Sequence, residues 1–248
     1  MIKLNRISFS YKKGEPKIID TLSLEIKRGD IVAILGPNGG GKSTLVKLIN
    51  RSLIVNNGSV VINGEDINKL SRSEIAKLIA VVPQQIESIF PFTVYETIKM
   101  GSYLSSDKST DKIDEIMRIV GITYLKNRLV NELSGGERQL VFVARALIQD
   151  SKILILDEAT SNLDINHEST ILRVVKQLAA DRGLTVIAII HNINLATQFC
   201  KSAFFINRER YSAPININDA VSLDNLSEYY TLNRDLITID NGNVKVRI

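Results

Sequence analysis

A glycine-rich segment between an apolar run and a helical pattern constrains the fold of this chain more than any other feature. Ile31–Leu35 is apolar throughout, as expected of a strand buried on both faces of a sheet. The segment that follows consists of Gly36, Pro37, Asn38, Gly39, Gly40, Gly41, Lys42 and Ser43. Its glycines and the closing Gly-Lys-Ser let successive backbone N–H groups face an anion at the start of a helix. The sequence therefore predicts a phosphate-binding loop between a buried strand and a helix.

The side chains at the end of this loop have the chemistry that nucleotide binding requires. Lys42 is expected to reach the β- and γ-phosphates, and the Ser43 hydroxyl to ligate Mg²⁺. Thr44 follows directly and is grouped with them as a nucleotide contact. A flexible glycine loop without a ligand is the alternative. The strand before the loop and the helix after it favour phosphate binding, because that is the context which the mechanism needs.

A pair of carboxylates ends a second apolar run. Residues 153–156 are all Ile or Leu, and Asp157 and Glu158 follow them. Open α/β sheets bind ligands at the carboxyl ends of their strands. We expect Asp157 to hold Mg²⁺ through the water shell of the metal, and Glu158 to polarise an attacking water. In isolation, two acids at a solvated strand end would be the commoner explanation, but the phosphate-binding loop in the same chain favours a catalytic pair.

A second glycine-containing helix start lies between these two features. Ser134 is a good helix cap, and Gly135 and Gly136 bring backbone N–H groups within reach of phosphate; Glu137 completes the segment. Taken alone, this segment is better explained as an ordinary capped helix. It becomes informative because the chain already has one predicted anion-binding helix start.

Strand and helix patterns divide the chain into three kinds of segment. The first thirty residues alternate apolar and polar positions in short runs, which predicts antiparallel sheet. From about residue 85 to 132 the strand patterns stop and helical periodicity appears, which indicates a small inserted helical lobe. After residue 135, helices and strands alternate at the spacing of βαβ units, which predicts a parallel sheet.

These patterns predict an α/β phosphate-loop NTPase with a mixed, mainly parallel sheet as its core. An N-terminal antiparallel β subdomain and an inserted helical subdomain complete the fold. We expect a single domain over residues 1–248, with the helical subdomain at approximately 85–150 and a C-terminal β/α tail at approximately 203–248.

Composition excludes several other classes. Of the 248 residues, 44% are hydrophobic and 23% charged, as in an average soluble protein, so a disordered chain or a disulfide scaffold is excluded. The net charge of +4 is dispersed, which gives no support to nucleic-acid binding. No apolar run approaches the roughly 18 residues of a membrane helix. The first residues lack a signal-peptide core, so we expect a cytosolic chain unless a partner holds it at a membrane.

Together, these segments resemble the ATP-binding-cassette family over nearly the whole chain. The combination consists of the phosphate loop, the Leu-Ser-Gly-Gly-Glu signature (residues 133–137), the strand with Asp157 and Glu158, the loop 161–164 and His191. The resemblance implies an ATPase that uses ATP and Mg²⁺. It also implies a head-to-tail dimer, in which the signature of one subunit, Ser134 to Glu137, closes over the ATP held by the other.

The resemblance assigns roles to four further residues. Tyr11 would stack on adenine, and Gln84 would sense Mg²⁺ and the γ-phosphate. His191 would contact the γ-phosphate and order the catalytic water, and Asp164 would couple the two sites. The alternatives are a surface aromatic for Tyr11, a polar residue after a strand for Gln84 and a helix cap for His191. His167 has no motif and is expected to be a solvated helix residue.

The helical lobe and the tail are similar to those of importers for ferric siderophores, haem and cobalamin. The implied partners are a second copy of the chain, two permease subunits and, indirectly, a substrate-binding protein, with the chain peripheral on the cytoplasmic face of the membrane. Two departures are Ser102, where that group usually has Arg, and residues 207–210, which replace its usual Asn-Gly turn. Molybdate and zinc or manganese importers stay open as alternatives. A non-transport cassette and an ordinary phosphate-loop kinase or GTPase fit less well.

One loop is unusually apolar. Residues 85–92 include Phe90 and Phe92 on either side of a proline. Exposed apolar patches tend to mark interaction sites, so the loop is expected to contact the permease. The alternative is that both phenylalanines pack inside the helical lobe.

Overall fold

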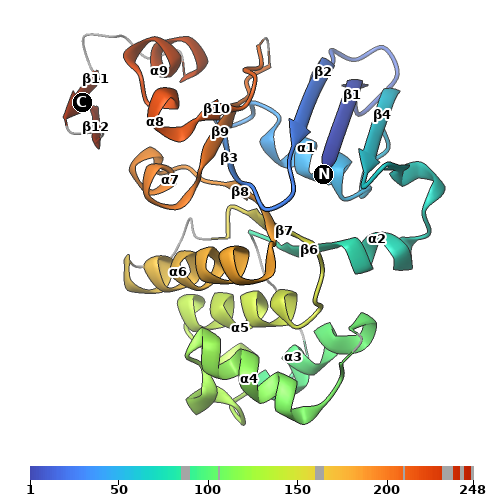
Figure 1. Cartoon of the computed structure of the whole chain (residues 1–248), viewed down its shortest axis with the longest axis vertical. Helices are drawn as coiled ribbons and strands as arrows, with labels where there is room; N and C mark the ends of the chain where they lie inside the picture. Colours follow the sequence, from blue (N-terminus) through green and yellow to red (C-terminus); the bar gives the residue numbers. More distant parts are fainter. Residues whose placement is uncertain are drawn as a thin grey trace. The chain divides into compact units, whose positions relative to one another are not determined.

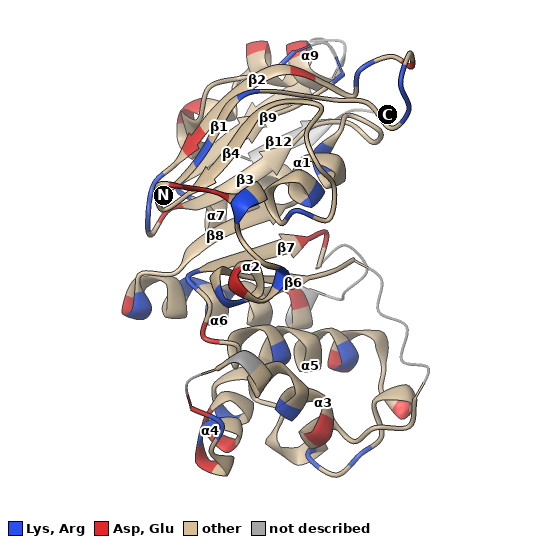
Figure 2. Cartoon of the chain, turned by 90° about the vertical axis from the view of Figure 1, so that its right-hand side faces the viewer, with Lys and Arg blue, Asp and Glu red and all other residues tan. Residues whose placement is uncertain are grey.

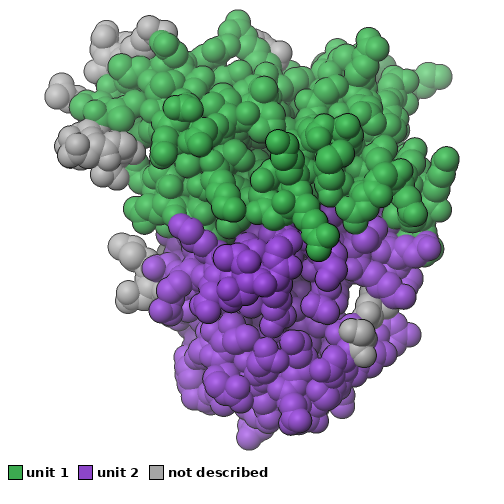
Figure 3. All heavy atoms as spheres, in the orientation of Figure 1, with its two compact units in different colours: residues 1–71, 187–248 green, residues 72–186 purple. Residues whose placement is uncertain are grey.

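The computed structural model of the chain describes residues 1–84, 90–105, 107–159, 165–208, 210–230, 237–240 and 243–246. The chain divides into two compact units, which Figure 3 distinguishes by colour. The first unit combines residues 1–71 with 187–248, and the second consists of residues 72–186. The division falls inside strand β8 (Thr185–Ile189), all of which is buried. The predicted limits of the helical subdomain and of the C-terminal tail stay predictions.

The first unit contains the predicted antiparallel sheet. Its strands are β1 (Ile2–Phe9), β2 (Ile19–Ile26), β4 (Asn57–Ile62) and β5 (Glu65–Asp66), in the order β2-β1-β4-β5. Alternation along the strands turns one set of apolar side chains inward, because successive residues point to opposite faces. Leu4 lies opposite both Leu24 and Val60, and all three are buried. The antiparallel prediction for this part of the chain is confirmed.

Parallel strands in the same unit position the glycine-rich loop. Strand β3 (Ile31–Leu35) is buried at all five residues and pairs in parallel with β9 (Ser202–Phe205). Helix α1 (Lys42–Ile49) follows the loop. The other elements are β10 (Ile215–Asn216), η1 (Ile67–Lys69), α7 (Ile193–Phe199), α8 (Ile217–Ala220), α9 (Leu223–Tyr230) and the hairpin of β11 (Ile237–Asp240) and β12 (Asn243–Val246).

The second unit holds a parallel strand pair and five α-helices among the residues that the structure describes. Strand β6 (Ile79–Val82) pairs in parallel with β7 (Ile153–Asp157). The helical elements are α2 (Arg72–Leu78), α3 (Val94–Gly101), η2 (Ser102–Leu104), α4 (Thr110–Val120), η3 (Thr123–Leu125), η4 (Val130–Glu132), α5 (Gly135–Leu147) and α6 (Ile165–Arg182). Helix α5 lies between α6 and the pair α3 and α4 (Figure 1).

Local sequence explains where the helices of this unit begin and end. Thr93 and Glu96 form a capping box at the start of α3, and Ser109 caps α4 by accepting a hydrogen bond from the Lys112 N–H. Gly121 directly follows the last residue of α4 and adopts the left-handed conformation common after a helix. The buried face of α4 includes Ile116, as its helical periodicity predicts.

Two sequence-based expectations about the surface can be compared with the structure. Lys and Arg are interspersed with Asp and Glu along both units (Figure 2), as the dispersed charge predicts. Over the described ranges, every helix is too short or too polar to cross a bilayer.

Candidate functional site

The glycine-rich loop is tightly packed against the strand beside it. Gly36, its first residue, has φ 146°, and a Cβ atom there would lie 2.0 Å from the carbonyl oxygen of Ile206, just beyond β9. Only glycine fits such a close approach. Gly41 ends the loop with φ 101° and starts α1, where its carbonyl accepts a hydrogen bond from the Leu45 N–H at 2.8 Å. The loop therefore joins β3 to the start of α1, as the sequence predicts.

Lys42 lies over this loop and is almost fully buried. Its side-chain Nζ donates hydrogen bonds to the carbonyl oxygens of Gly36 and Pro37, each at 2.9 Å. A buried ammonium group needs such partners, because removal from water is costly for a charged group. The two carbonyls hold the positive charge at the loop, where the phosphates of a nucleotide would be bound.

Tyr11 contacts the helix that follows the loop. Its hydroxyl lies 3.1 Å from the Thr44 hydroxyl, and its ring meets Phe9 edge to face with 5.1 Å between centroids. The Tyr11 side chain is nevertheless 56% exposed, whereas Thr44 is buried and Ser43 half-buried. An exposed aromatic ring next to the loop suits a stacking role, which stays a prediction.

The second unit brings two of the predicted catalytic residues together. Gln84 follows β6, Glu158 follows β7, and the Gln84 Nε2 atom donates a hydrogen bond to the Glu158 Oε2 atom at 2.5 Å. Glu158 has φ 51°, in the left-handed region that non-glycine residues rarely adopt. Such strain tends to persist at functional sites, where the surrounding structure over-determines the conformation. Asp157 forms the end of β7 and is half-buried.

The signature segment forms a complete helix cap. Ser134 precedes α5, its hydroxyl accepts a hydrogen bond from the Glu137 N–H at 3.3 Å, and the Glu137 carboxylate accepts hydrogen bonds from the Ser134 N–H and hydroxyl. These bonds, the backbone one foremost, hold the pKa of the Glu137 carboxyl below its ordinary value. Ser134 and Gly135 are exposed, so the start of α5 is accessible to a ligand. The predicted capping by Ser134 is confirmed.

Two residues that carry no motif also support the signature helix. Gln139, buried in α5, donates through Nε2 to the carbonyl oxygen of Pro83 at 3.3 Å, directly before Gln84. The His167 ring packs against Gly136, where an added Cβ atom would lie only 2.7 Å from the ring. His167 is therefore half-buried, whereas the sequence predicts a solvated helix residue. Both contacts join residues distant in sequence, so no local pattern announces them.

The remaining predicted residues have simpler surroundings. His191 follows β8 and is exposed. The residue that caps α7 is Asn192, not His191. The Asn192 side chain accepts a hydrogen bond from the Leu195 N–H at 3.2 Å at the start of α7. Asp164 and the rest of residues 160–164 lie outside the described residues.

The predicted ligands for a metal ion have the chemistry that Mg²⁺ prefers. Ser43 offers a hydroxyl oxygen, Gln84 an amide oxygen and Asp157 a carboxylate. Mg²⁺ binds oxygen donors and commonly combines one or two protein carboxylates with substrate phosphates and water. The donor set therefore fits this ion.

These features define an α/β phosphate-loop NTPase. Comparison with known proteins identifies the family. Residues 19–161 match the family described as ABC transporter, and the chain belongs to this family. Among its relatives is the cobalamin import ATP-binding protein of Halobacterium salinarum, 39% identical over 189 residues, or 74% of this chain and 48% of that protein. The chain thus spans about half the length of that relative.

Other relatives match over most of their length. The iron(3+)-hydroxamate import ATP-binding protein of Bacillus subtilis is 31% identical to this chain. The match covers 91% of this chain and 86% of that protein. Among solved structures, cbiO1 of Clostridium perfringens, part of the cbiONQ ABC transporter complex, has a TM-score of 0.80 and 26% identity, with 92% of each chain covered. A dimeric ATP-binding cassette in a post-hydrolysis state with ADP and Pi has a TM-score of 0.77 and 29% identity, over 86% of this chain and 98% of that one. The predicted fold class is confirmed.

Proposed function

We propose that this chain is the ATP-hydrolysing subunit of an ABC import system. The observation that carries the proposal is the pairing of Gln84 with Glu158 at 2.5 Å in a chain that also has a complete phosphate loop and a capped signature helix. Relatives that are import ATP-binding proteins over most of this chain support the same function.

Nucleotide binding rests on the first unit. Tyr11 stacks on the adenine, the backbone N–H groups of the glycine loop cradle the phosphates, and Lys42 contacts the β- and γ-phosphates. Ser43 in this unit, and Gln84 and Asp157 in the second unit, would supply oxygen donors to Mg²⁺. When bound, this ion would neutralise negative charge on the phosphates.

Hydrolysis rests on Glu158 as the general base. Its carboxylate accepts a proton from a water molecule, whose oxygen forms a bond to the γ-phosphorus while the bond to the ADP oxygen breaks. The Gln84 amide donates a hydrogen bond to one oxygen of this carboxylate and so orients the base. His191 contacts the γ-phosphate and orders the water.

The signature gives the site its second half. Two copies of the chain pair head to tail, so that Ser134 and the N–H groups of Gly135 and Gly136 bind the γ-phosphate held by the other copy. Asp164, which lies outside the described residues, couples the two sites. The structural similarity to a dimeric cassette with ADP and Pi supports this arrangement.

A groove on the second unit fits a permease. Met100, Tyr103, Phe142 and Arg145 line it, and Met100 and Tyr103 are 43% and 76% exposed. We assign its occupant as a short cytoplasmic helix of the permease, because relatives with this domain are import proteins and the exposed side chains of Met100 and Tyr103 suit the apolar face of an amphipathic helix.

The apolar loop before α3 extends the exposed apolar surface of this unit. Phe90 and Phe92 are 63% and 39% exposed, with 5.9 Å between their ring centroids. The alternative, in which both pack inside the lobe, is therefore wrong. Residues 85–89, the rest of the predicted contact, lie outside the described residues.

The proposed cargo is a ferric siderophore, haem or cobalamin. Support comes from relatives named for the import of cobalamin, iron(3+)-hydroxamate and hemin. In this proposal the chain works at the cytoplasmic face of the membrane, bound to two permease subunits, and a substrate-binding protein delivers the cargo to the permease.

Three measurements test the proposal. The purified chain should release phosphate from ATP in the presence of Mg²⁺, and a tagged chain should co-purify multi-span permease subunits from solubilised membranes. Reconstitution of those subunits in vesicles should then give ATP-dependent uptake of radiolabelled cargo. A chain that neither binds nor hydrolyses ATP would contradict the proposal.

A further inference from the structure

The first residue of the glycine loop is fixed from two sides by residues near the C-terminus. On one side, the Ile206 carbonyl oxygen fills the space where a Cβ atom of Gly36 would lie. On the other, the Gly36 N–H donates a hydrogen bond to the Tyr230 hydroxyl oxygen at 3.1 Å. These partners lie 170 and 194 residues after Gly36 in the sequence.

The same glycine holds the lysine of the loop. The Gly36 carbonyl accepts one of the two hydrogen bonds that the Lys42 Nζ atom donates to loop carbonyls. A continuous chain of hydrogen bonds therefore runs from the Tyr230 hydroxyl through the Gly36 residue to the Lys42 ammonium. Gly36 and Lys42 are buried and Tyr230 is half-buried. Away from water, hydrogen bonds are strong, and a polar group left without one is costly.

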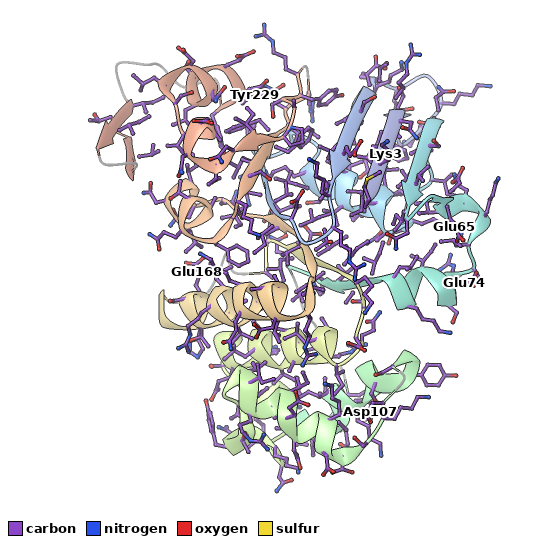
Figure 4. The ribbon with its side chains drawn as sticks, viewed as in Figure 1. Lys3, Glu65, Glu74, Asp107, Glu168 and Tyr229 are labelled. Carbon is purple, nitrogen blue, oxygen red and sulfur yellow. The ribbon has the colours of Figure 1, made fainter. Side chains whose placement is uncertain are left out.

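Tyr230 is well anchored. It is the last residue of α9, and its ring meets Phe205 edge to face with 6.4 Å between centroids. Its neighbour Tyr229, labelled in Figure 4, stacks on the same Phe205 ring, with 5.0 Å between the ring centroids. Burial raises the pKa of Tyr230 to about 12, so the phenol stays neutral at physiological pH.

The turn after β9 adds a second link to the same loop. Arg208 Nε donates to the Gly39 carbonyl oxygen at 3.2 Å, and Asn207 Nδ2 donates to the Tyr229 carbonyl oxygen at 3.3 Å. This turn is part of the segment that departs from the usual Asn-Gly. The turn thus contacts both the glycine loop and α9, and it helps to hold the Tyr230 hydroxyl next to the loop.

We infer that Tyr230 is a positioning residue for nucleotide binding, which acts through Gly36 to hold the Lys42 ammonium over the loop. The inference rests on the proposed function, since it assumes that the loop binds ATP. Through Tyr230, the C-terminal segment then supports the ATP site by fixing the glycine loop.

Substitution of Tyr230 by Phe tests this role, because it removes the hydroxyl and keeps the ring on Phe205. We expect Tyr230→Phe to weaken ATP binding roughly 5-fold to 10-fold, the scale of one buried hydrogen bond. Titration with a fluorescent ATP analogue reports the affinity. Steady-state kinetics should show a raised KM with kcat little changed, because the lost interaction serves ground-state and transition-state binding alike. Tyr229→Phe is the matched control: it removes the neighbouring hydroxyl of the same helix and should bind ATP as the wild type does.

A double-mutant cycle separates positioning of Lys42 from a general structural effect. If Tyr230 acts through Lys42, Tyr230→Phe should have little further effect on ATP affinity in a Lys42→Ala chain. Equal losses in both backgrounds, or wild-type affinity for Tyr230→Phe, would overturn the inference. Wild-type chain that binds no ATP would overturn the proposed function as well, so the two failures are distinguishable.

Hydrogen exchange at the Gly36 amide tests the inference in the wild-type chain, so it does not depend on whether Tyr230→Phe folds. In the wild-type chain without nucleotide, a peptide that covers Gly36 should exchange slowly at that amide, because its N–H is bonded to Tyr230. Fast exchange there would show that the hydrogen bond is absent in solution and would overturn the inference without any variant.

Discussion

Gln84 and Glu158 form a direct hydrogen bond, from the Gln84 Nε2 atom to the Glu158 Oε2 atom at 2.5 Å. The register of the two strands before them explains the contact: Val82 lies opposite Leu156, so the residues two positions further on emerge side by side. Parallel strands end at the same edge of a sheet, and that edge is where such folds bind ligands. A glutamine amide on one carboxylate oxygen is an arrangement suited to orienting a general base.

The first prediction concerns Glu158 as this base. Glu158→Gln should lower ATP hydrolysis by at least ~10²-fold, the usual scale for the loss of general-base catalysis, and leave ATP binding intact. Phosphate release and nucleotide titration measure the two effects. The variant should also accumulate as an ATP-bound dimer in size-exclusion chromatography. Near-normal turnover would refute the assignment.

The sequence was sufficient for features that local patterns determine. The glycine loop, the Ser134 cap and the alternation of residues 22–26 in β2 follow from residues close together in the chain, and the structure has all three. Periodicity and capping chemistry act over a few residues, so they can be interpreted without knowledge of the tertiary structure.

Contacts between distant segments could not be predicted in this way. The hydrogen bond of Gly36 to Tyr230 joins residues 194 apart, and that of Gln139 to Pro83 joins residues 56 apart. Neither side chain belongs to a local motif, and their partners are backbone groups, which every residue has. The packing of His167 against Gly136 was missed for the same reason.

The second prediction separates the two halves of the proposed site. Lys42→Ala removes a charge that contacts the phosphates, so ATP affinity of the monomer should fall by about 10-fold to 100-fold. Ser134→Arg should spare binding by the monomer and abolish hydrolysis, because Ser134 acts on ATP held by the other copy. Fluorescent-nucleotide titration at low protein concentration measures the first effect.

Mixing the two inactive variants provides the control for the second prediction. In a head-to-tail heterodimer, one site combines the intact Lys42 of one subunit with the intact Ser134 of the other. Some ATP hydrolysis should therefore return on mixing. If Ser134→Arg weakens monomer binding as severely as Lys42→Ala does, the head-to-tail arrangement is wrong.

The third prediction concerns the permease contact. Phe90 and Tyr103 are 63% and 76% exposed, so replacing both by Ser should leave the melting temperature and the basal ATPase rate of the isolated chain unchanged. Co-purification with the permease should weaken, and cargo uptake in reconstituted vesicles should stop. Ile54→Ser, which changes a side chain that is 62% exposed in the other unit, is the matched control and should dock normally. Normal docking by the double variant would place the contact elsewhere.

The fourth prediction concerns the charge on Glu137. Hydrogen bonds from Ser134 hold the pKa of this carboxyl below its ordinary value in the folded state, so its charged form stabilises the start of α5. That contribution is present above the unfolded pKa and is lost as the pH falls through the folded pKa. Glu137→Gln should therefore melt about 1–2 °C below the wild type at pH 7, a small effect because the group is solvent-screened.

The difference between the two chains should shrink as the pH falls from 7 through the lowered folded-state pKa of Glu137, where the wild-type carboxyl becomes protonated. Circular-dichroism melts across this range measure it. Glu132→Gln is the control, since it removes a charge from the preceding exposed turn and leaves the capping box of α5 intact. A difference between wild type and Glu137→Gln that stays constant down to acid pH would show that the carboxylate charge does not stabilise the signature helix.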